Sequence, residues 1–283
     1  MPPPSYPLPF LEVRCTTICA ENESVVLCAG YEGGYWRSER LAAHLLQWLP
    51  YVALDHTQQE EFSIATWLDQ VELAAAHVYK TEKTKSRGEL GEVMLHIACV
   101  QEFGTLPILC KLVLKTSHND TVKGFDAVHM LPIANDEFEI WLGEAKFYTD
   151  ARRAIVEALA SIKDHILPSF LNTEKAMIYS HIPSHIPNAK QVRAIFRRST
   201  SSDELMARAV FPVFVAYESS TIANSTEITA EFCELIKQEV TKLHNEFLED
   251  GVKLMLRFQL IFLPLGSKAE LISHFDKKLG AIT

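Results

Sequence analysis

The sequence lacks an excess of positive charge: its 283 residues hold 27 Lys and Arg against 36 Asp and Glu, a formal net charge of −9. This balance excludes a basic protein that wraps DNA unaided. Glycine and proline are also scarce, at 11 and 13 residues, which excludes fibrous and low-complexity classes. Because 48% of the residues are hydrophobic, the chain can bury a substantial core. We expect a globular protein of one elaborated domain or two small ones.

No apolar run approaches the roughly 18 to 20 residues that span a bilayer. The first residues, Met1 to Ser5, lack the basic and apolar regions of a secretory signal. We therefore expect a cytoplasmic location. The six cysteines are scattered and include no repeated C-x-x-C pair, which indicates reduced thiols rather than disulfides or a zinc site. Phosphate-loop, zinc-hydrolase and nucleophile-elbow motifs are absent, which argues against the corresponding enzyme classes.

Acidic residues are concentrated at the start of the chain. Residues 1–80 hold ten acidic residues against four basic ones, whereas the remainder holds 26 against 23. Helical spacing of apolar residues in this part predicts helices over 38–49 and 63–80. We predict an acidic, largely helical N-terminal region over 1–85, which keeps the chain off DNA or faces a basic partner. A second domain is predicted over 86–283.

The second domain alternates between helical and strand patterns. Its first helix is predicted to begin with a capping box of Ser86 and Glu89 and to end at Gly104. The predicted order is α-β-β-β-α-β, with a polar turn over 116–123 and elements over 89–103, 106–115, 125–131, 138–148, 150–167 and 175–182. Beyond it we predict a basic, loop-like segment, a strand, a helix and a strand, over 184–202, 210–218, 229–248 and 252–263.

Two short motifs place charged side chains in these apolar strands. Gly124-Phe125-Asp126 lies at the start of the second strand, and Gly143-Glu144-Ala145-Lys146 lies inside the third. Side chains alternate between the faces of a strand, so Glu144 and Lys146 share one face. Apolar residues flank them on both faces, which indicates a central strand, where charges are costly unless they are paired or bind a ligand. The motifs therefore indicate a functional site.

Two carboxylates and a lysine on neighbouring strands suit metal-assisted hydrolysis of a phosphodiester. Asp126 and Glu144 supply oxygen ligands for a hard cation such as Mg²⁺, with Mn²⁺ as a substitute, and the cation polarises the phosphate and activates a water. Lys146 supplies a positive charge that orients this water and stabilises the charge developing on phosphorus. The alternative is an internal ion-pair network of the same three residues with a purely structural role.

The order of elements and the two motifs together resemble the PD-(D/E)XK nuclease superfamily, over Gly88 to Ile182. The core of this superfamily is an α-β-β-β-α-β unit with Asp on the second strand and (D/E)-x-K on the third. The resemblance implies that Asp126 and Glu144 bind metal and that Lys146 is the catalytic lysine. The residue before Asp126 is Phe125, where the superfamily motif has proline.

Members of this superfamily often add an acid from the first helix. Our choice for that acid is Glu92, as a metal ligand and part of the catalytic set, and the alternative is Glu89. The two lie one helical turn apart, and the sequence leaves open which of them faces the sheet. Acidic residues in a first turn are also favoured by the helix dipole alone.

A narrower resemblance is carried by four segments: RGELGEVMLH, GFDAVH, WLGEAKFY and DARRAIVEALASIKDHI. They resemble the HamA family of the two-component Hachiman antiphage system. This resemblance implies a DNA nuclease that works with HamB, a superfamily 2 helicase, in an antiphage defence complex. Our leading hypothesis is accordingly a Mg²⁺-dependent DNA nuclease. The alternative is a catalytically silent subunit that docks to or regulates a helicase; the presence of Asp126, Glu144 and Lys146 favours the nuclease.

Overall fold

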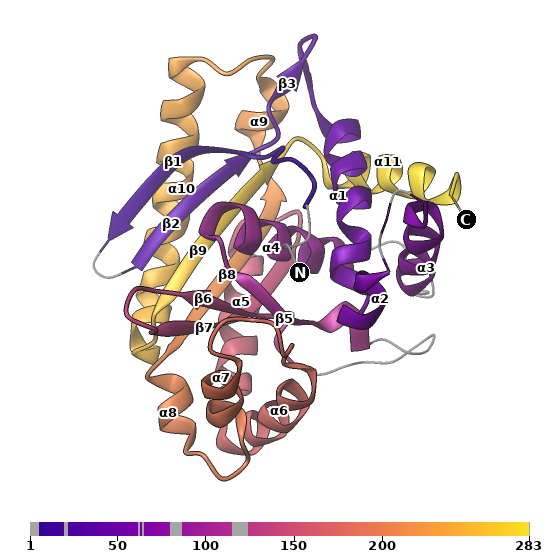
Figure 1. Ribbon diagram of the computed structural model, residues 1–283. Helices are drawn as coiled ribbons and strands as arrows, with labels where there is room; N and C mark the ends of the chain where they lie inside the picture. Colours follow the sequence, from indigo (N-terminus) through magenta and orange to yellow (C-terminus); the bar gives the residue numbers. More distant parts are fainter. Residues whose placement is uncertain are drawn as a thin grey trace.

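A mixed sheet of seven strands forms the centre of the molecule, seen here in a computed structural model (Figure 1). The structure describes residues 6–19, 22–61, 63, 65–79, 87–114 and 124–282. The strands are β1 (Glu12–Cys19), β2 (Asn22–Cys28), β3 (Tyr31–Glu32), β4 (Tyr35–Trp36), β5 (Leu106–Cys110), β6 (Ala127–Pro132), β7 (Phe138–Phe147), β8 (Ala209–Glu218) and β9 (Phe258–Leu265). They lie in the sheet in the order β1-β2-β9-β8-β7-β6-β5, and β3 pairs with β4 in a separate hairpin.

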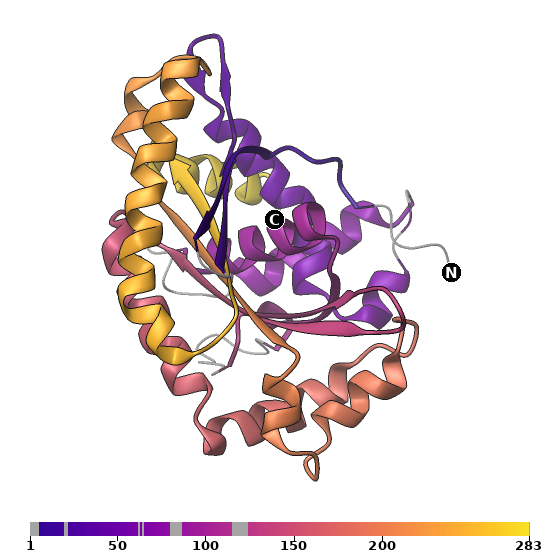
Figure 2. The same ribbon diagram turned by 90° about the vertical axis from the view of Figure 1, so that its left-hand side faces the viewer.

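Helices cover both faces of this sheet. They are α1 (Ser38–Ala53), α2 (His56–Glu60), α3 (Trp67–Tyr79), α4 (Glu89–Phe103), α5 (Ala151–His165), α6 (Pro168–His181), α7 (Ala189–Phe196), α8 (Ser202–Met206), α9 (Ser220–Asn224), α10 (Ala230–Gly251) and α11 (Lys268–Gly280). Helices α5 and α10 pack on one face, and α1, α4 and α11 pack on the other (Figure 2). The sheet therefore separates two apolar cores.

Strands β8 and β9 are apolar except for Glu218 and Gln259. Every residue in them is buried except Glu218, as expected for strands that are covered on both faces. Strand β8 pairs in parallel with both β7 and β9, whereas β5, β6 and β7 form an antiparallel ladder. Strand β7 thus lies between an antiparallel and a parallel neighbour. The prediction that residues 143–146 belong to a central strand is confirmed.

Several other predictions are confirmed with small changes at the ends. The helix predicted over 89–103 is α4, and Gly104 ends it in the left-handed conformation with φ of 66°. The predicted strand over 138–148 is β7, and the predicted helix over 150–167 is α5. The strand predicted over 106–115 is shorter, because β5 ends at Cys110 and a 3₁₀ helix, η1 (Lys111–Leu114), follows it.

The strand predicted over 175–182 is wrong. These residues belong to α6, in which Leu171, Lys175 and Ile178 recur at intervals of four and three and are all buried. Pro168 at the first turn also favours a helix start. The strand that joins β7 is instead β8. The predicted loop over 184–202 is also wrong in part, since it contains α7.

The N-terminal strands β1 and β2 were not predicted from the sequence. Strand β2 pairs in parallel with β9, so residues from both ends of the described chain belong to one sheet. The predicted domain boundary at 85/86, the capping residue Ser86 and the turn over 116–123 lie outside the described residues.

Within the described part of the chain, none of the helices combines the length and the apolar character needed to cross a membrane. The five described cysteine side chains are free thiols, as expected: Cys15, Cys28, Cys99, Cys110 and Cys233.

Candidate active site

Asp126 and Glu144 lie close together where β6 begins beside β7. Ala127 pairs with Gly143 in the β6–β7 ladder, and the Asp126 N–H donates to the Gly143 carbonyl at 2.9 Å. Asp126 directly precedes β6, and burial together with the charge of Asp126 raises the pKa of Glu144 in β7. The two predicted carboxylates therefore lie close together.

Hydrogen bonds fix both carboxylates. One oxygen of Asp126, Oδ2, accepts from the Ala145 N–H at 2.8 Å, and Oδ1 accepts from Lys111 Nζ at 3.1 Å. Glu144 Oε1 accepts from Lys146 Nζ at 2.8 Å, so Glu144 and Lys146 share a face as predicted. Both carboxyl side chains are buried. The arrangement contains two carboxylates and two ammonium groups.

The environment of Glu144 disfavours its negative charge. Burial and repulsion from Asp126 raise the pKa of Glu144 to about 7, although Lys146 opposes this shift. The second oxygen, Oε2, is buried and has no hydrogen-bond partner among the described residues. His165 Nδ1 lies 3.7 Å from this oxygen, but burial lowers the pKa of His165 to about 4, so its ring is neutral near pH 7. Glu144 Oε2 is thus available to a cation.

Lys111 is a site residue that the sequence analysis missed. It begins η1, directly after β5, and its Nζ contacts the Gly124 carbonyl at 3.4 Å as well as Asp126. Burial opposes its charge, but attraction to Asp126, Glu92 and Glu144 outweighs burial and raises the pKa of Lys111. A lysine that interrupts the apolar run 106–114 was the available signal. Its ammonium group acts as a counter-charge to the acidic cluster.

Glu174 of α6 is a second missed residue. Its Oε2 accepts from the Phe125 N–H at 3.2 Å, and only 3% of its surface is exposed. Burial raises the pKa of Glu174 to about 7, although the Phe125 N–H and Lys111 oppose this shift. Gly124 is required beside it, because its φ is 145° and a Cβ there would lie 2.7 Å from Glu174 Oε2. Glu174 therefore positions the segment that precedes Asp126.

The two acids of α4 have different surroundings. Glu89 pairs with the buried Arg87 at 3.0 Å, and Arg87 also pairs with Asp276 of α11 at 2.6 Å. Glu92 is buried too, and its charge raises the pKa of Lys111 at the site. These contacts favour Glu92 as the helix acid and give Glu89 a structural partner.

We expect Glu89→Gln and Glu92→Gln to separate these two roles. Glu89→Gln weakens a buried ion pair and should lower the free energy of unfolding by about 1–3 kcal/mol without changing Mg²⁺ affinity. Glu92→Gln removes negative charge near Lys111 and should weaken Mg²⁺ binding about tenfold or more. Urea unfolding and calorimetric titration with Mg²⁺ measure the two effects. The reverse pattern would assign the site role to Glu89.

The residue types fit a hard divalent cation, through two carboxylates. Among the described residues, no group of three or more His, Cys, Asp or Glu side chains is arranged to hold a metal ion. Asp126 and Glu144 nevertheless supply oxygen ligands of the type that Mg²⁺ prefers, and Glu144 Oε2 has no competing hydrogen bond among the described residues. The two carboxylates repel each other, and this repulsion adds to burial in raising the pKa of Glu144. A bound cation would relieve this repulsion.

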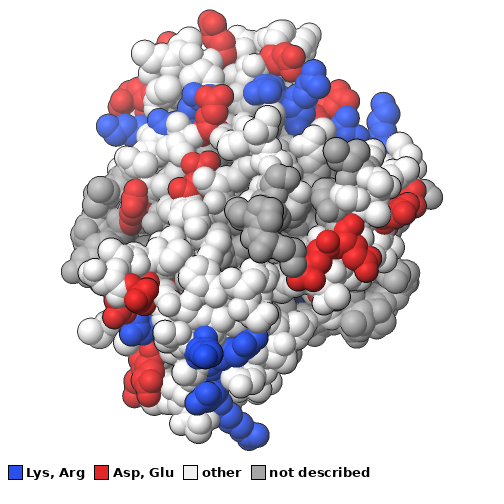
Figure 3. All heavy atoms as spheres, viewed as in Figure 1, with Lys and Arg blue, Asp and Glu red and all other residues white. Residues whose placement is uncertain are grey.

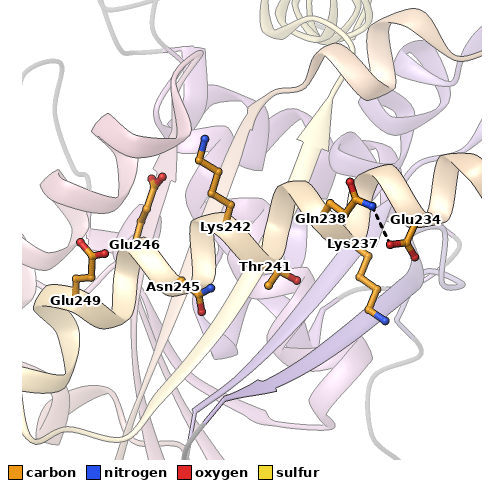
Figure 4. Close-up of a pocket in the computed structure, with 8 residues that line it drawn as sticks. All are labelled: Glu234, Lys237, Gln238, Thr241, Lys242, Asn245, Glu246 and Glu249. Carbon is orange, nitrogen blue, oxygen red and sulfur yellow. Dashed lines mark hydrogen bonds between the residues drawn. The ribbon is translucent and has the colours of Figure 1, made fainter.

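A groove on another part of the surface does not compete with this site. A groove of about 560 Å³ runs along α10 and is lined by Glu234, Lys237, Gln238, Thr241, Lys242, Asn245, Glu246 and Glu249. All of these polar side chains project from one helix, and a hydrogen bond joins Gln238 to Glu234 (Figure 4). Ligand sites usually gather groups from several elements around an apolar lining. We interpret the groove as a solvated helix face.

Comparison with known proteins adds a family match. A family model described as HamA matches residues 8–279. Anti-bacteriophage protein A of Escherichia coli is 23% identical to this chain over 273 residues. Those residues cover 94% of this chain and 49% of that protein, so the chain spans about half the length of the relative. The region matched by the family model contains every residue of the candidate site.

Proposed function

Since the chain belongs to the HamA family, we propose that it is a metal-dependent DNA nuclease of the PD-(D/E)XK type. The observation that carries this proposal is the closeness of Asp126, directly before β6, to Glu144 in β7, with Lys146 hydrogen-bonded to Glu144. The elements α4, β5, β6, β7, α5 and β8 follow one another in the α-β-β-β-α-β order of that superfamily, with α6, α7 and α8 inserted before β8. Strand β8 takes the position that the sequence analysis gave to 175–182.

The side chains of the site have different roles in the proposed reaction. Asp126 and Glu144 would hold a Mg²⁺ or Mn²⁺ ion, which when bound polarises the scissile phosphate and acidifies a water. Glu92 adds negative charge beside Lys111 and does not form a three-carboxylate ligand group with them among the described residues. Lys146 donates from Nζ and stabilises negative charge that develops on the phosphate oxygens. Glu144 accepts that Nζ hydrogen bond and so orients the lysine. The Ala145 N–H holds Asp126 through Oδ2.

We further propose that the chain serves antiphage defence together with a helicase. The name of the Escherichia coli relative, Anti-bacteriophage protein A, supports the defence role. The partner that the family resemblance implies is HamB, a superfamily 2 helicase, and DNA is the proposed substrate. A helicase partner also suits the acidic net charge of −9, because a chain of this charge gains from a partner that delivers DNA.

One experiment separates the nuclease from a silent, docking subunit. The chain is co-expressed with the product of the adjacent gene, and plasmid and linear DNA are incubated with the purified complex with and without Mg²⁺. We expect both DNAs to be degraded only when Mg²⁺ is present. A complex that binds no divalent cation and leaves both DNAs intact would establish the silent subunit instead.

The position of Lys111 leads to a prediction about metal affinity. Because its ammonium group neutralises the acidic cluster, it competes with a cation for Asp126. We expect Lys111→Met to bind Mg²⁺ at least about tenfold more tightly and to unfold more easily without metal, since the carboxylates lose their counter-charge. Calorimetric titration checks the affinity, with the exposed Lys163→Met as control. Weaker binding by Lys111→Met than by the unaltered chain would contradict this role.

A further inference from the structure

The basic residues of α7 and the turn after it have no acidic partners among the described residues. Lys190, Arg197 and Arg198 are exposed, and Arg193 donates only to the Ile182 carbonyl, at 2.7 Å. None of the described carboxylates lies within ion-pair distance of these four residues, which we call the α7 basic surface. In Figure 3, blue atoms gather over α7 in the lower part of the molecule. The surface is an uncompensated positive patch on an acidic chain.

Most arginines outside the α7 basic surface form ion pairs with acidic side chains. Outside 189–198, every arginine except Arg37 forms an ion pair with a described carboxylate. Arg37 instead donates to the Ala29 carbonyl and lies over the Phe10 ring. The arginines of the α7 basic surface lack such an ion pair among the described residues, which leaves their charge available to another molecule.

The turn that carries Arg197 and Arg198 is rigidly held. The Thr200 N–H donates to the Arg197 carbonyl at 3.0 Å, and the Thr200 hydroxyl donates to the Ala194 carbonyl at 2.6 Å. Beneath the turn, the fully buried Lys175 donates from Nζ to the Thr200 carbonyl. A surface that is held in place before it binds loses less conformational entropy on binding.

Helix α6 connects this surface to the candidate active site. Its consecutive residues Glu174 and Lys175 reach in two directions, the first to the Phe125 N–H beside Asp126 and the second to the turn at Thr200. Neighbouring residues of one helix thus contact both the segment beside Asp126 and the turn that carries Arg197 and Arg198. A nucleic acid that is held at the site and continues along α6 would place phosphates over the surface.

From these contacts we infer that the α7 basic surface binds the phosphate backbone of the nucleic acid on which the active site acts. This inference rests on the proposed function for the identity of the polyanion. Arginine suits the role because its guanidinium group can donate two hydrogen bonds to one phosphate. The apolar residues of α7, Val192, Ile195 and Phe196, are all buried, so the surface lacks the apolar centre of a typical protein interface.

The test measures DNA binding without metal, so that cleavage plays no part. Binding of the full chain to a short DNA duplex is followed by fluorescence anisotropy over a series of salt concentrations. We expect the triple variant Lys190→Gln, Arg197→Gln and Arg198→Gln to bind at least about tenfold more weakly at low salt. The slope of log affinity against log salt should fall by about 2 to 3, since each phosphate contact contributes about 0.9.

The matched control is a second triple variant that removes three positive charges outside the α7 basic surface. The variant Arg208→Gln, Arg257→Gln and Lys253→Gln alters three exposed residues that are paired with acids, and it should keep the original slope. Equal slopes for the two triple variants, or no binding by the unaltered chain, would overturn the inference. Binding of poly-glutamate as tight as that of DNA would assign the surface to an acidic protein. Binding without cleavage in Mg²⁺ would refute the nuclease proposal alone.

Discussion

Replacing Glu144 by glutamine should reduce Mg²⁺-dependent DNA degradation by about 10²–10³-fold or more, the cost of losing one preorganised charge from a transition state. The amide has nearly the same shape as the carboxylate, and its oxygen can still accept from Lys146 Nζ. It lacks the negative charge that a divalent cation requires. The loss should appear as a slower rate of degradation of linear DNA by the complex at saturating Mg²⁺.

The fold should survive this substitution, because burial already disfavours the charge of Glu144. Glu139→Gln is a matched control: Glu139 lies on the same strand and pairs with Arg257, away from the site. The control should degrade DNA at the original rate. Circular dichroism of both metal-free variants checks that they are folded. A folded Glu144→Gln variant that cleaves as fast as the unaltered complex would remove Glu144 from the mechanism.

Replacing Glu174 by glutamine should stabilise the metal-free chain at high pH. The folded-state pKa of Glu174 is raised from 4.5 to about 7, so the folded state holds this proton more tightly than the unfolded state. The protonated Glu174 carboxyl therefore contributes to the free energy of unfolding. This contribution is fully present below about pH 4.5 and is lost as the pH rises through about 7. Glutamine does not ionise and keeps an acceptor for the Phe125 N–H.

The free energy of unfolding of Glu174→Gln should exceed that of the unaltered chain by at most about 3 kcal/mol above pH 7. The difference is smaller if water screens the carboxylate. Near pH 5 the variant and the unaltered chain should differ little. Urea unfolding between these pH values measures the difference, with the exposed Glu204→Gln as control. Glu174→Ala should be less stable at every pH, because it also removes the acceptor of the Phe125 N–H. A difference between Glu174→Gln and the unaltered chain that does not change with pH would show that Glu174 is not buried as an acid.

The motif strand could be predicted because its signal is local. Glu144 and Lys146 interrupt an apolar run, and the period of two along a strand fixes which side chains share a face. The helix α4 was predictable for a similar reason, from its apolar spacing and the glycine at its end, Gly104. Its start differs from the prediction, because the N-cap is Gly88 and no side-chain hydrogen bond caps it, in place of the expected capping box. Both predictions depended only on residues that are close together in the sequence.

The fourth strand failed because its signal was ambiguous. The run 175–182 is short, and a short apolar run fits either a strand or one face of a helix. Both this run and the sequence of β8 were predicted as strands, and only tertiary packing decides which of them joins β7. The resulting error placed Glu174 just outside a strand and hid its approach to Phe125.

Lys111 and Glu174 could not be assigned to the site from local patterns. Lys111 and Asp126 are hydrogen-bonded although they are 15 residues apart in the sequence, and Glu174 and Phe125 are hydrogen-bonded although they are 49 residues apart. Neither residue lies in a motif of fixed spacing. The choice between Glu89 and Glu92 was open for the same reason, because it depends on Arg87 and on Asp276 near the other end of the chain. Tertiary contacts supply what the sequence patterns lack.

The pairing of β2 with β9 has a consequence for how the protein is made. The side chain of Gln259 donates to the Glu23 carbonyl across 236 positions, and Ser38 of α1 donates to Glu270 of α11 across 232. During synthesis, β2 leaves the ribosome long before its partner exists. Contacts of such large sequence separation slow folding and prolong exposure of unpaired strand edges. The apolar strand β9 pairs with β2, so the sheet should close only after residues 258–265 have left the ribosome.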